Sequence, residues 1–126
     1  RPLTIGRPVN KHGLVNRMCA YNKAISDPNR MKMIKILGSS PEHTLTVSDI
    51  AAVLGISQPA ATKHLRVLYA VGLVQPTRVG TSVYYALDDE ALRDYRRQLD
   101  WAFEHAYTPC PYDFKCDECP KAETCM

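Results

Sequence analysis

The most constraining feature of the sequence is a pair of helix-start signals joined by a short turn that contains glycine. Residues 46–49 have the form of a capping box, in which the hydroxyl of Thr46 is followed three positions later by the carboxylate of Asp49. Beyond Gly55, Ser57 can cap a second helix, and Pro59 falls within its first turn, where a missing N–H does no harm. Two short helices joined in this way are typical of a helix-turn-helix.

Apolar spacing predicts the buried faces of these two helices. The first helix carries apolar side chains at the i, i+3, i+4 and i+7 positions expected of an amphipathic helix, namely Val47, Ile50, Ala51 and Leu54. The second helix is expected over about residues 58–69, with Ala61, Leu65 and Leu68 facing inward. Gly72 then ends it.

The flanking segments predict a small, mainly α-helical domain with one β-hairpin. Residues 11–25 have near-helical apolar spacing, and Asp27-Pro28 starts another helix that ends near residues 38–41. Residues 73–79 and 82–87 are expected to form a hairpin that turns at Gly80. A last helix begins after three acidic residues at positions 88–90. This order indicates a winged helix-turn-helix.

The last helix carries a longer apolar seam than so small a core needs. The seam consists of Leu92, Tyr95, Leu99, Ala102, Phe103 and Ala106, and it predicts contact with a helix of a second subunit. We therefore expect a flexible arm at residues 1–10, a DNA-binding and dimerisation domain at residues 11–106, and a cysteine-rich tail at residues 107–126. The tail should be looped, because Pro109, Pro111 and Pro120 oppose a regular helix.

Charge is distributed unevenly along the 126 residues. Residues 1–87 carry eleven Lys or Arg and three acidic residues, whereas residues 88–126 carry five basic and ten acidic residues. A basic body with an acidic tail favours a polyanionic partner for the body. No apolar run is long enough to cross a bilayer, so we expect a cytoplasmic protein that does not contact a membrane.

The sequence resembles the ArsR/SmtB family of winged helix-turn-helix repressors over roughly residues 14–106. The motifs that carry the resemblance are residues 24–30 (AISDPNR), 47–51 (VSDIA), 57–60 (SQPA) with His64-Leu65, 72–74 (GLV), 78–80 (RVG) and 84–87 (YYAL). The resemblance implies a homodimer that forms through the N- and C-terminal helices. Its two recognition helices would enter successive major grooves of a pseudo-palindromic operator.

The resemblance also indicates where the family's sensor sites would lie. The Cys-x-Cys pair on the first helix of the helix-turn-helix corresponds to Thr46 and Ser48 here, which cannot act as thiolate ligands. The second family site uses carboxylates and His along the last helix, and this sequence has no matching His pair there. The sequence therefore departs from the family pattern at both familiar sites.

The candidate DNA-binding residues come from the second helix and from the hairpin. Gln, Thr and Lys side chains on an outward helix face can reach base edges, whereas Arg side chains pair with phosphates. The predicted contacts are Ser57, Gln58, Pro59, Thr62, Lys63, His64, Arg66 and, on the wing, Arg78. His64 is interpreted as a packed or phosphate-bonded side chain, because no second metal ligand lies at helical spacing.

Four of the five cysteines lie within the last 17 residues, at Cys110, Cys116, Cys119 and Cys125, while Cys19 is interpreted as a small apolar residue of the first helix. The two-residue gap between Cys116 and Cys119 delivers two sulfurs to one ion, and the flanking cysteines can complete a tetrahedron. Zinc, an iron–sulfur cluster or As(III) would each suit these thiolates, and disulfides remain open.

The sequence therefore predicts a DNA-binding transcriptional repressor whose operator affinity responds to a thiophilic metal, metalloid or cluster at the tail cysteines. One alternative is a winged-helix regulator or adaptor with a purely structural zinc site in the tail, and another is a redox protein. An enzyme is not expected, because the sequence has no phosphate-binding glycine loop and no set of nucleophile, base and acid.

Overall fold

The computed structural model describes residues 13–40, 42 and 44–120 of the chain. The expected arm at residues 1–10 and the last tail cysteine, Cys125, lie outside the described residues. The described residues form five α-helices, namely α1 (Gly13–Ile25), α2 (Pro28–Ser39), α3 (Val47–Leu54), α4 (Gln58–Ala70) and α5 (Asp89–His105). The strands are β1 (Leu45–Thr46), β2 (Val74–Val79) and β3 (Ser82–Leu87). No helix of the described residues is long and apolar enough to cross a membrane.

Side-chain caps start four of the helices. The Asp27 carboxylate accepts from the backbone N–H groups of Asn29 and Arg30 at the start of α2. The capping box at α3 is complete, because Thr46 and Asp49 accept from each other's backbone N–H groups. Ser57 caps α4 and Asp88 caps α5. The helix starts predicted from the sequence at these positions are confirmed.

The helix-turn-helix packs on α2 and on the base of the hairpin. Ile50 of α3 and Ala61, Leu65 and Leu68 of α4 are fully buried, as the apolar spacing predicted. They share one core with Met33, Leu37, Leu73 and Val74. Gly55 ends α3 with a φ of +70°, a left-handed conformation that glycine adopts without strain. This turn sets the angle between α3 and α4.

The wing is a three-stranded antiparallel sheet with strand order β1-β3-β2. β2 and β3 pair from Val74 opposite Leu87 to Val79 opposite Ser82, and Gly80 turns the hairpin with a φ of +64°. β1 was not predicted; it adds Leu45 opposite Tyr85 and Thr46 opposite Tyr84. Two residues are too short a strand to show an alternating pattern in the sequence.

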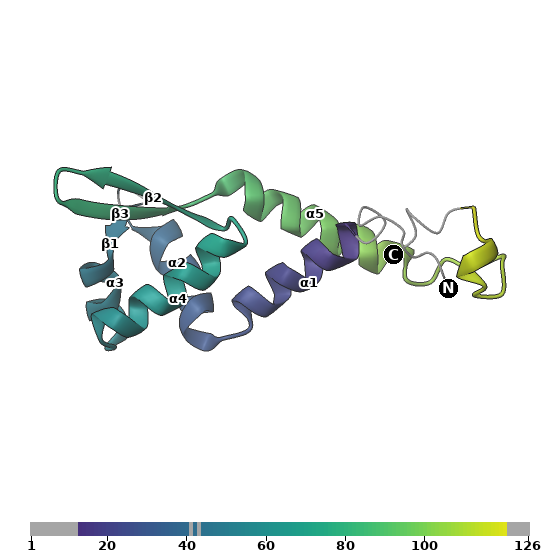
Figure 1. Cartoon of the computed structure of the whole chain (residues 1–126), viewed down its shortest axis with the longest axis horizontal. Helices are drawn as coiled ribbons and strands as arrows, with labels where there is room; N and C mark the ends of the chain where they lie inside the picture. Colours follow the sequence, from purple (N-terminus) through teal and green to yellow (C-terminus); the bar gives the residue numbers. More distant parts are fainter. Residues whose placement is uncertain (1–12, 41, 43, 121–126) are drawn as a thin grey trace.

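Helices α1 and α5 run side by side away from the helix-turn-helix, and the tail continues beyond the end of α5 (Figure 1). Tyr95 of α5 packs edge-on against Tyr21 of α1 with ring centroids 5.1 Å apart, and its hydroxyl donates to the Asn22 side chain. The apolar seam of α5 is therefore divided. Tyr95 and Ala102 are buried within the subunit, whereas the side chain of Phe103 is 70% exposed. The expectation that the whole seam faces a second subunit is wrong for Tyr95 and Ala102, because both are covered within the subunit.

The described part of the tail is looped, which confirms the prediction from its prolines. A turn joins Tyr112 to Lys115, and a short 3-10 turn, η2 (Cys116–Glu118), follows. Asp113 and Phe114 have φ values of +57° and +63° in this turn. The first thiols of the tail thus lie on irregular backbone beyond the helical body.

Candidate DNA-binding surface and cysteine-rich tail

The outward face of α4 gathers most of the predicted DNA-binding residues. Because Ala61, Leu65 and Leu68 are buried, the opposite face of the helix is held toward solvent. A surface hollow on this face is lined by Gln58, Pro59, Ala60, Thr62, Lys63 and Arg66. Five of the residues expected from the sequence therefore lie together. They combine two uncharged hydrogen-bonding side chains with two cations.

Gln58 is held by a contact that the sequence did not suggest. Its amide Nε2 donates to the hydroxyl Oγ of Ser48 in α3 over 3.2 Å. The bond orients the amide and leaves its oxygen as an acceptor for a donor on a base edge. In the sequence, Ser48 stands out only as the position that corresponds to a sensor cysteine of the family. Nothing in its sequence spacing shows that it contacts a residue ten positions away.

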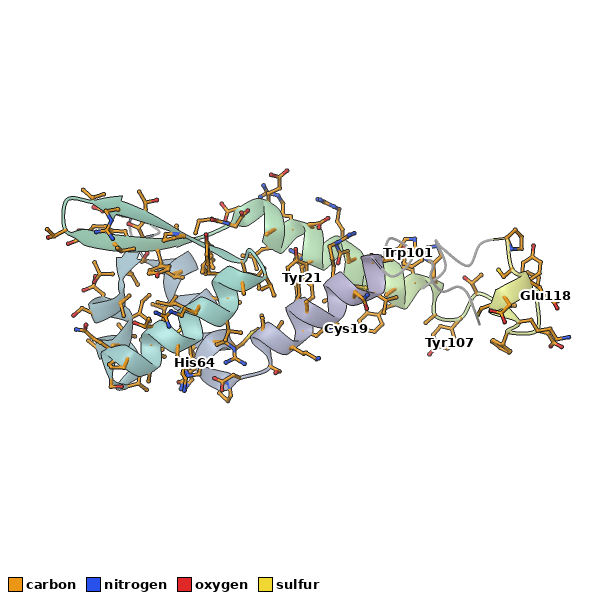
Figure 2. All side chains as sticks on the ribbon, in the orientation of Figure 1. Cys19, Tyr21, His64, Trp101, Tyr107 and Glu118 are labelled. Atoms are coloured by element: carbon orange, nitrogen blue, oxygen red, sulfur yellow. The ribbon has the colours of Figure 1, made fainter. Side chains whose placement is uncertain are left out.

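His64 does not line the hollow on α4. Its Nδ1 lies 3.1 Å from a guanidinium nitrogen of Arg30 in α2, and Figure 2 shows the ring at the edge of α4, away from the wing. The side chain is partly buried between α4 and the start of α2. Arg30 belongs to one of the motifs that carry the family resemblance, but no pattern in the sequence indicates a role of its own for this residue.

The carboxyl group of Asp27 lies next to this contact and has a pKa below its ordinary value. Desolvation acts to raise the pKa, but the backbone hydrogen bonds from Asn29 and Arg30 and the positive charge of the Arg30 guanidinium lower it by more. The ionised carboxylate is thus the form that caps α2 and faces the Arg30 guanidinium.

Arg78 is exposed on β2, opposite Val83 in the hairpin register. The hairpin projects from the body at the end of the molecule that also carries α3 and α4 (Figure 1). A cation on a projecting wing is suited to a phosphate or to the minor groove. The structure therefore places Arg78 at a second surface, separate from the hollow on α4.

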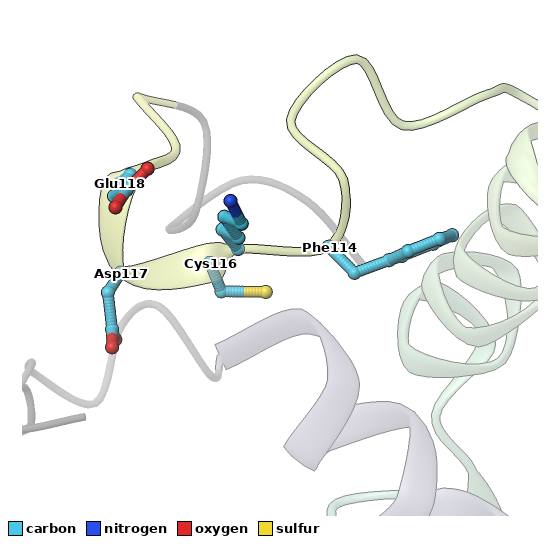
Figure 3. Close-up of a pocket in the computed structure, with 5 residues that line it drawn as sticks. Phe114, Cys116, Asp117 and Glu118 are labelled. Carbon is cyan, nitrogen blue, oxygen red and sulfur yellow. The ribbon is translucent and has the colours of Figure 1, made fainter.

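The described part of the tail, which carries Cys110, Cys116 and Cys119, lies far from α4, at the opposite end of the molecule (Figure 1). Cys110 and Cys116 are exposed, and Cys119 is partly buried. Cys116 lines an open hollow with Phe114, Lys115, Asp117 and Glu118, and Figure 3 shows its sulfur and the Phe114 ring on the side that faces the helices. Among the described residues, no three His, Cys, Asp or Glu side chains are grouped closely enough to hold a metal ion.

The chain is similar to known regulators of transcription. The helix-turn-helix domain family model matches residues 25–77. The chain is 36% identical to the transcriptional repressor SdpR of Bacillus subtilis, in an alignment that covers 63% of this chain and 81% of SdpR. It is 39% identical to the Staphylococcus aureus homologue of the cadmium resistance regulator CadC, over 66% of this chain and 64% of the homologue. The chain thus spans less than two thirds of the length of that homologue.

Solved structures show the same architecture. The solution structure of a homodimeric winged helix-turn-helix DNA-binding domain from Mycobacterium bovis superposes with a TM-score of 0.61 at 25% identity. The superposition covers 81% of this chain and 93% of that domain. The matched part excludes a fifth of this chain.

Proposed function

The chain belongs to the ArsR/SmtB family of winged helix-turn-helix transcriptional regulators, and from this premise we propose that it is a dimeric, sequence-specific DNA-binding repressor. Members of this family regulate transcription and are not enzymes. SdpR and the CadC homologue carry the names of a repressor and of a resistance regulator. The proposal for this chain depends on its own recognition surface.

The observation that carries the proposal is the composition of the exposed face of α4. Gln58 and Thr62 are uncharged donors and acceptors that suit base edges, and Lys63 and Arg66 supply positive charge beside them. An α-helix fits the major groove, and a hairpin on the same end of the molecule can reach the adjacent backbone. Arg78 would make that second contact.

The dimer is proposed to form through α1 and α5. Phe103 is largely exposed in the subunit, and Leu92 and Leu99 are only partly covered. A partner helix laid along this stripe would remove apolar surface from water. The related Mycobacterium bovis domain is a homodimer, which supports the assignment. Two-fold symmetry would place two α4 helices about 34 Å apart, on successive major grooves of a pseudo-palindrome.

The DNA proposal is tested by selecting sites from a random duplex library. The enriched duplex should be a pseudo-palindrome, and its affinity should fall with rising salt because Lys and Arg displace counterions from phosphates. Fluorescence anisotropy of the enriched duplex and of a scrambled duplex would measure the ratio of the two affinities. Enrichment of no sequence would overturn the proposal of sequence-specific binding.

For the tail we propose that Cys110, Cys116, Cys119 and Cys125 hold one thiophilic metal or cluster in each subunit. The donor set fits, because four thiolates suit zinc or an iron–sulfur cluster, and three suit As(III). Cys116 begins η2 and Cys119 follows its last residue, so one short turn of backbone carries both cysteines. When bound, such a group supplies a cross-link between the parts of the tail that carry the four cysteines.

We propose further that this site controls operator affinity. The tail continues directly from α5, the helix assigned to the dimer, so ordering the tail can bias the angle between the two subunits. The name of the CadC homologue also associates that relative with cadmium resistance. The competing function is a structural staple, which would order the tail and leave DNA binding unchanged.

Protein purified without oxygen would show what the tail binds. Absorption in the visible indicates a cluster, whereas colourless protein with stoichiometric zinc indicates a zinc thiolate site. Operator affinity of loaded and stripped protein would then be compared with that of a Cys116→Ser/Cys119→Ser variant, with Cys19→Ser as the matched control. A sensor should change operator affinity by about 5- to 150-fold. Equal affinities in all forms would leave the tail with a structural role.

A further inference from the structure

The guanidinium of Arg30 connects three helices at the edge of the recognition helix. Its Nε donates to the carbonyl of Ala24, and one terminal nitrogen donates to the carbonyl of Lys23 over 3.5 Å. Both carbonyls belong to the last turn of α1, where backbone acceptors have no partner within the helix. The other terminal nitrogen lies 3.1 Å from Nδ1 of His64 in α4. One side chain of α2 thus contacts the end of α1 and the flank of α4.

The chemistry of this contact fixes the tautomer of His64. A guanidinium has only donors, so the ring nitrogen facing it must be the acceptor. His64 is therefore neutral in this arrangement, and its one ring proton is on Nε2. The charged groups that face the ring are the Arg30 guanidinium and the Asp27 carboxylate, both from the start of α2. A second proton on Nδ1 would meet the guanidinium.

Among the described residues, two side-chain hydrogen bonds to other helices hold the N-terminal half of α4. Gln58 is bonded to Ser48 of α3. His64 is bonded to Arg30 of α2, whose own backbone N–H is held by the Asp27 cap. Lys63, which precedes His64, points into the hollow proposed to meet DNA. A small rotation of α4 about its axis would therefore change how Lys63 and its neighbours present to a base edge.

We propose that Arg30 is a positioning residue for operator recognition, acting through His64 and not by touching DNA. It holds α4 at one rotation relative to α1, and α1 belongs to the proposed dimer interface. The inference depends on the proposed DNA-binding function and deepens it, because it names the contact that relates the recognition helix to the dimer. Loss of this contact should lower the affinity for the pseudo-palindrome more than it lowers the affinity for DNA of other sequence.

The test uses the full chain with Arg30→Met and His64→Phe, singly and together. Arg30→Met keeps the length of the side chain but removes every donor, and His64→Phe keeps a flat ring without the acceptor. Lys32→Met, an exposed cation of the same helix, is the matched control. The readouts are affinity for the selected operator and for scrambled duplex, the salt dependence of both, urea unfolding, and ¹⁵N NMR of the histidine ring nitrogens.

The expected result is an affinity for operator at least about tenfold lower in each single variant, with the double variant no worse than Arg30→Met alone, because both changes remove the shared Arg30–His64 contact. Affinity for scrambled duplex and the salt slope should stay unchanged. In wild type, the ¹⁵N spectrum should show His64 protonated on Nε2, and Arg30→Met should release a mixture of tautomers. His64→Gln, whose amide oxygen can accept from Arg30, should restore much of the operator affinity.

Three outcomes would overturn the proposal. A salt slope reduced by about one in Arg30→Met would mean that Arg30 contacts a phosphate itself. Additive losses in the double variant would mean that the two residues act separately. Lower unfolding free energy with an unchanged operator-to-scrambled ratio would mean a structural role only. If wild-type protein selects no operator, the proposed function fails, and the tautomer spectrum still tests the Arg30–His64 contact separately.

Discussion

The bond between Ser48 and Gln58 makes a sharp test of how α4 discriminates between bases. In the structure, the Ser48 hydroxyl accepts one proton of the Gln58 amide, and the amide oxygen is left for DNA. Gln58→Ala removes the whole group that would contact a base. Ser48→Ala removes only its tether, so the amide can turn and present either its oxygen or its nitrogen.

The size of each effect follows from what is lost. A well-made contact to a base edge discriminates by about 1–3 kcal/mol, so Gln58→Ala should lower the ratio of operator to random affinity by roughly 5- to 150-fold. Ser48→Ala loses one ordinary hydrogen bond, which contributes about 0.5–1.5 kcal/mol, and the same ratio should fall by roughly 2- to 12-fold. Both residues are uncharged, so neither change alters the number of phosphate contacts.

The assay is fluorescence anisotropy of operator and random duplexes across a salt series. Arg78→Ala serves as the contrasting variant, because it removes a cation from the wing and should weaken both duplexes alike. Its plot of log affinity against log salt should flatten by about 0.9 for one lost phosphate contact, whereas the slopes for Ser48→Ala and Gln58→Ala should match wild type.

Equal losses on operator and random DNA for Gln58→Ala would refute the assignment of Gln58 to base recognition. An unchanged specificity ratio in Ser48→Ala would refute the tether, even if Gln58 itself contacts a base. Selecting sites again with Ser48→Ala supplies an independent check. The base preference at one position of each half-site should relax and the others should stay.

The remaining predictions concern the dimer, the tail and the start of α2. Phe103→Asp should give monomers by sedimentation and weaken operator binding without unfolding the subunit, since Phe103 is exposed there, and Asp100→Ala on the same helix should remain dimeric. Metal binding by the tail should release protons and weaken as pH falls, because the ligands are thiolates. Calorimetry in buffers of different ionisation enthalpy would measure the number of protons released. Binding that does not depend on pH would argue against thiolate ligands. Asp27→Asn keeps an N-cap but removes the charge. Folding lowers the pKa of Asp27, so the charged carboxylate stabilises the folded protein at pH values above the pKa of the unfolded state. This stabilisation is lost as the pH falls through the pKa of the folded state. The stability advantage of wild type over Asp27→Asn in urea should therefore shrink below about pH 4, and an advantage that persists unchanged at lower pH would contradict the lowered pKa.

The local chemistry of the helix-turn-helix made its fold predictable. The residues that start and end its helices affect only backbone three or four positions away, so their roles can be predicted from the sequence. The caps at Thr46 with Asp49 and at Ser57, and the turn at Gly55, confirm these predictions. The apolar face of α4 was predictable for the same reason, because helical spacing alone relates Ala61, Leu65 and Leu68.

Contacts between distant segments were not predictable in this way. Arg30 and His64 are 34 residues apart, and Ser48 and Gln58 are ten residues apart on different helices. No periodicity relates such pairs, because the relation appears only when α1, α2 and α3 have packed around α4. The prediction that the whole apolar seam of α5 faces a second subunit failed for a similar reason. Helical spacing shows that Tyr95 and Phe103 are apolar positions, but only the placement of α1 decides which of them it covers.

The same geometry limits how the tail can influence DNA binding. The described part of the tail and α4 lie at opposite ends of the molecule, so a group bound there would act through the intervening helices (Figure 1). α5 contacts α1 through Tyr95 with Tyr21 and Asn22, and the far end of α1 contacts Arg30, which holds His64. A ligand changes affinity at a second site only when it favours one arrangement of such elements over another. If the tail is a sensor, Arg30→Met should therefore weaken the effect of loading the tail on operator affinity, while the affinity of the tail for its metal in the absence of DNA stays unchanged. If loading the tail changes operator affinity as much in that variant as in wild type, the effect is transmitted across the dimer interface without Arg30.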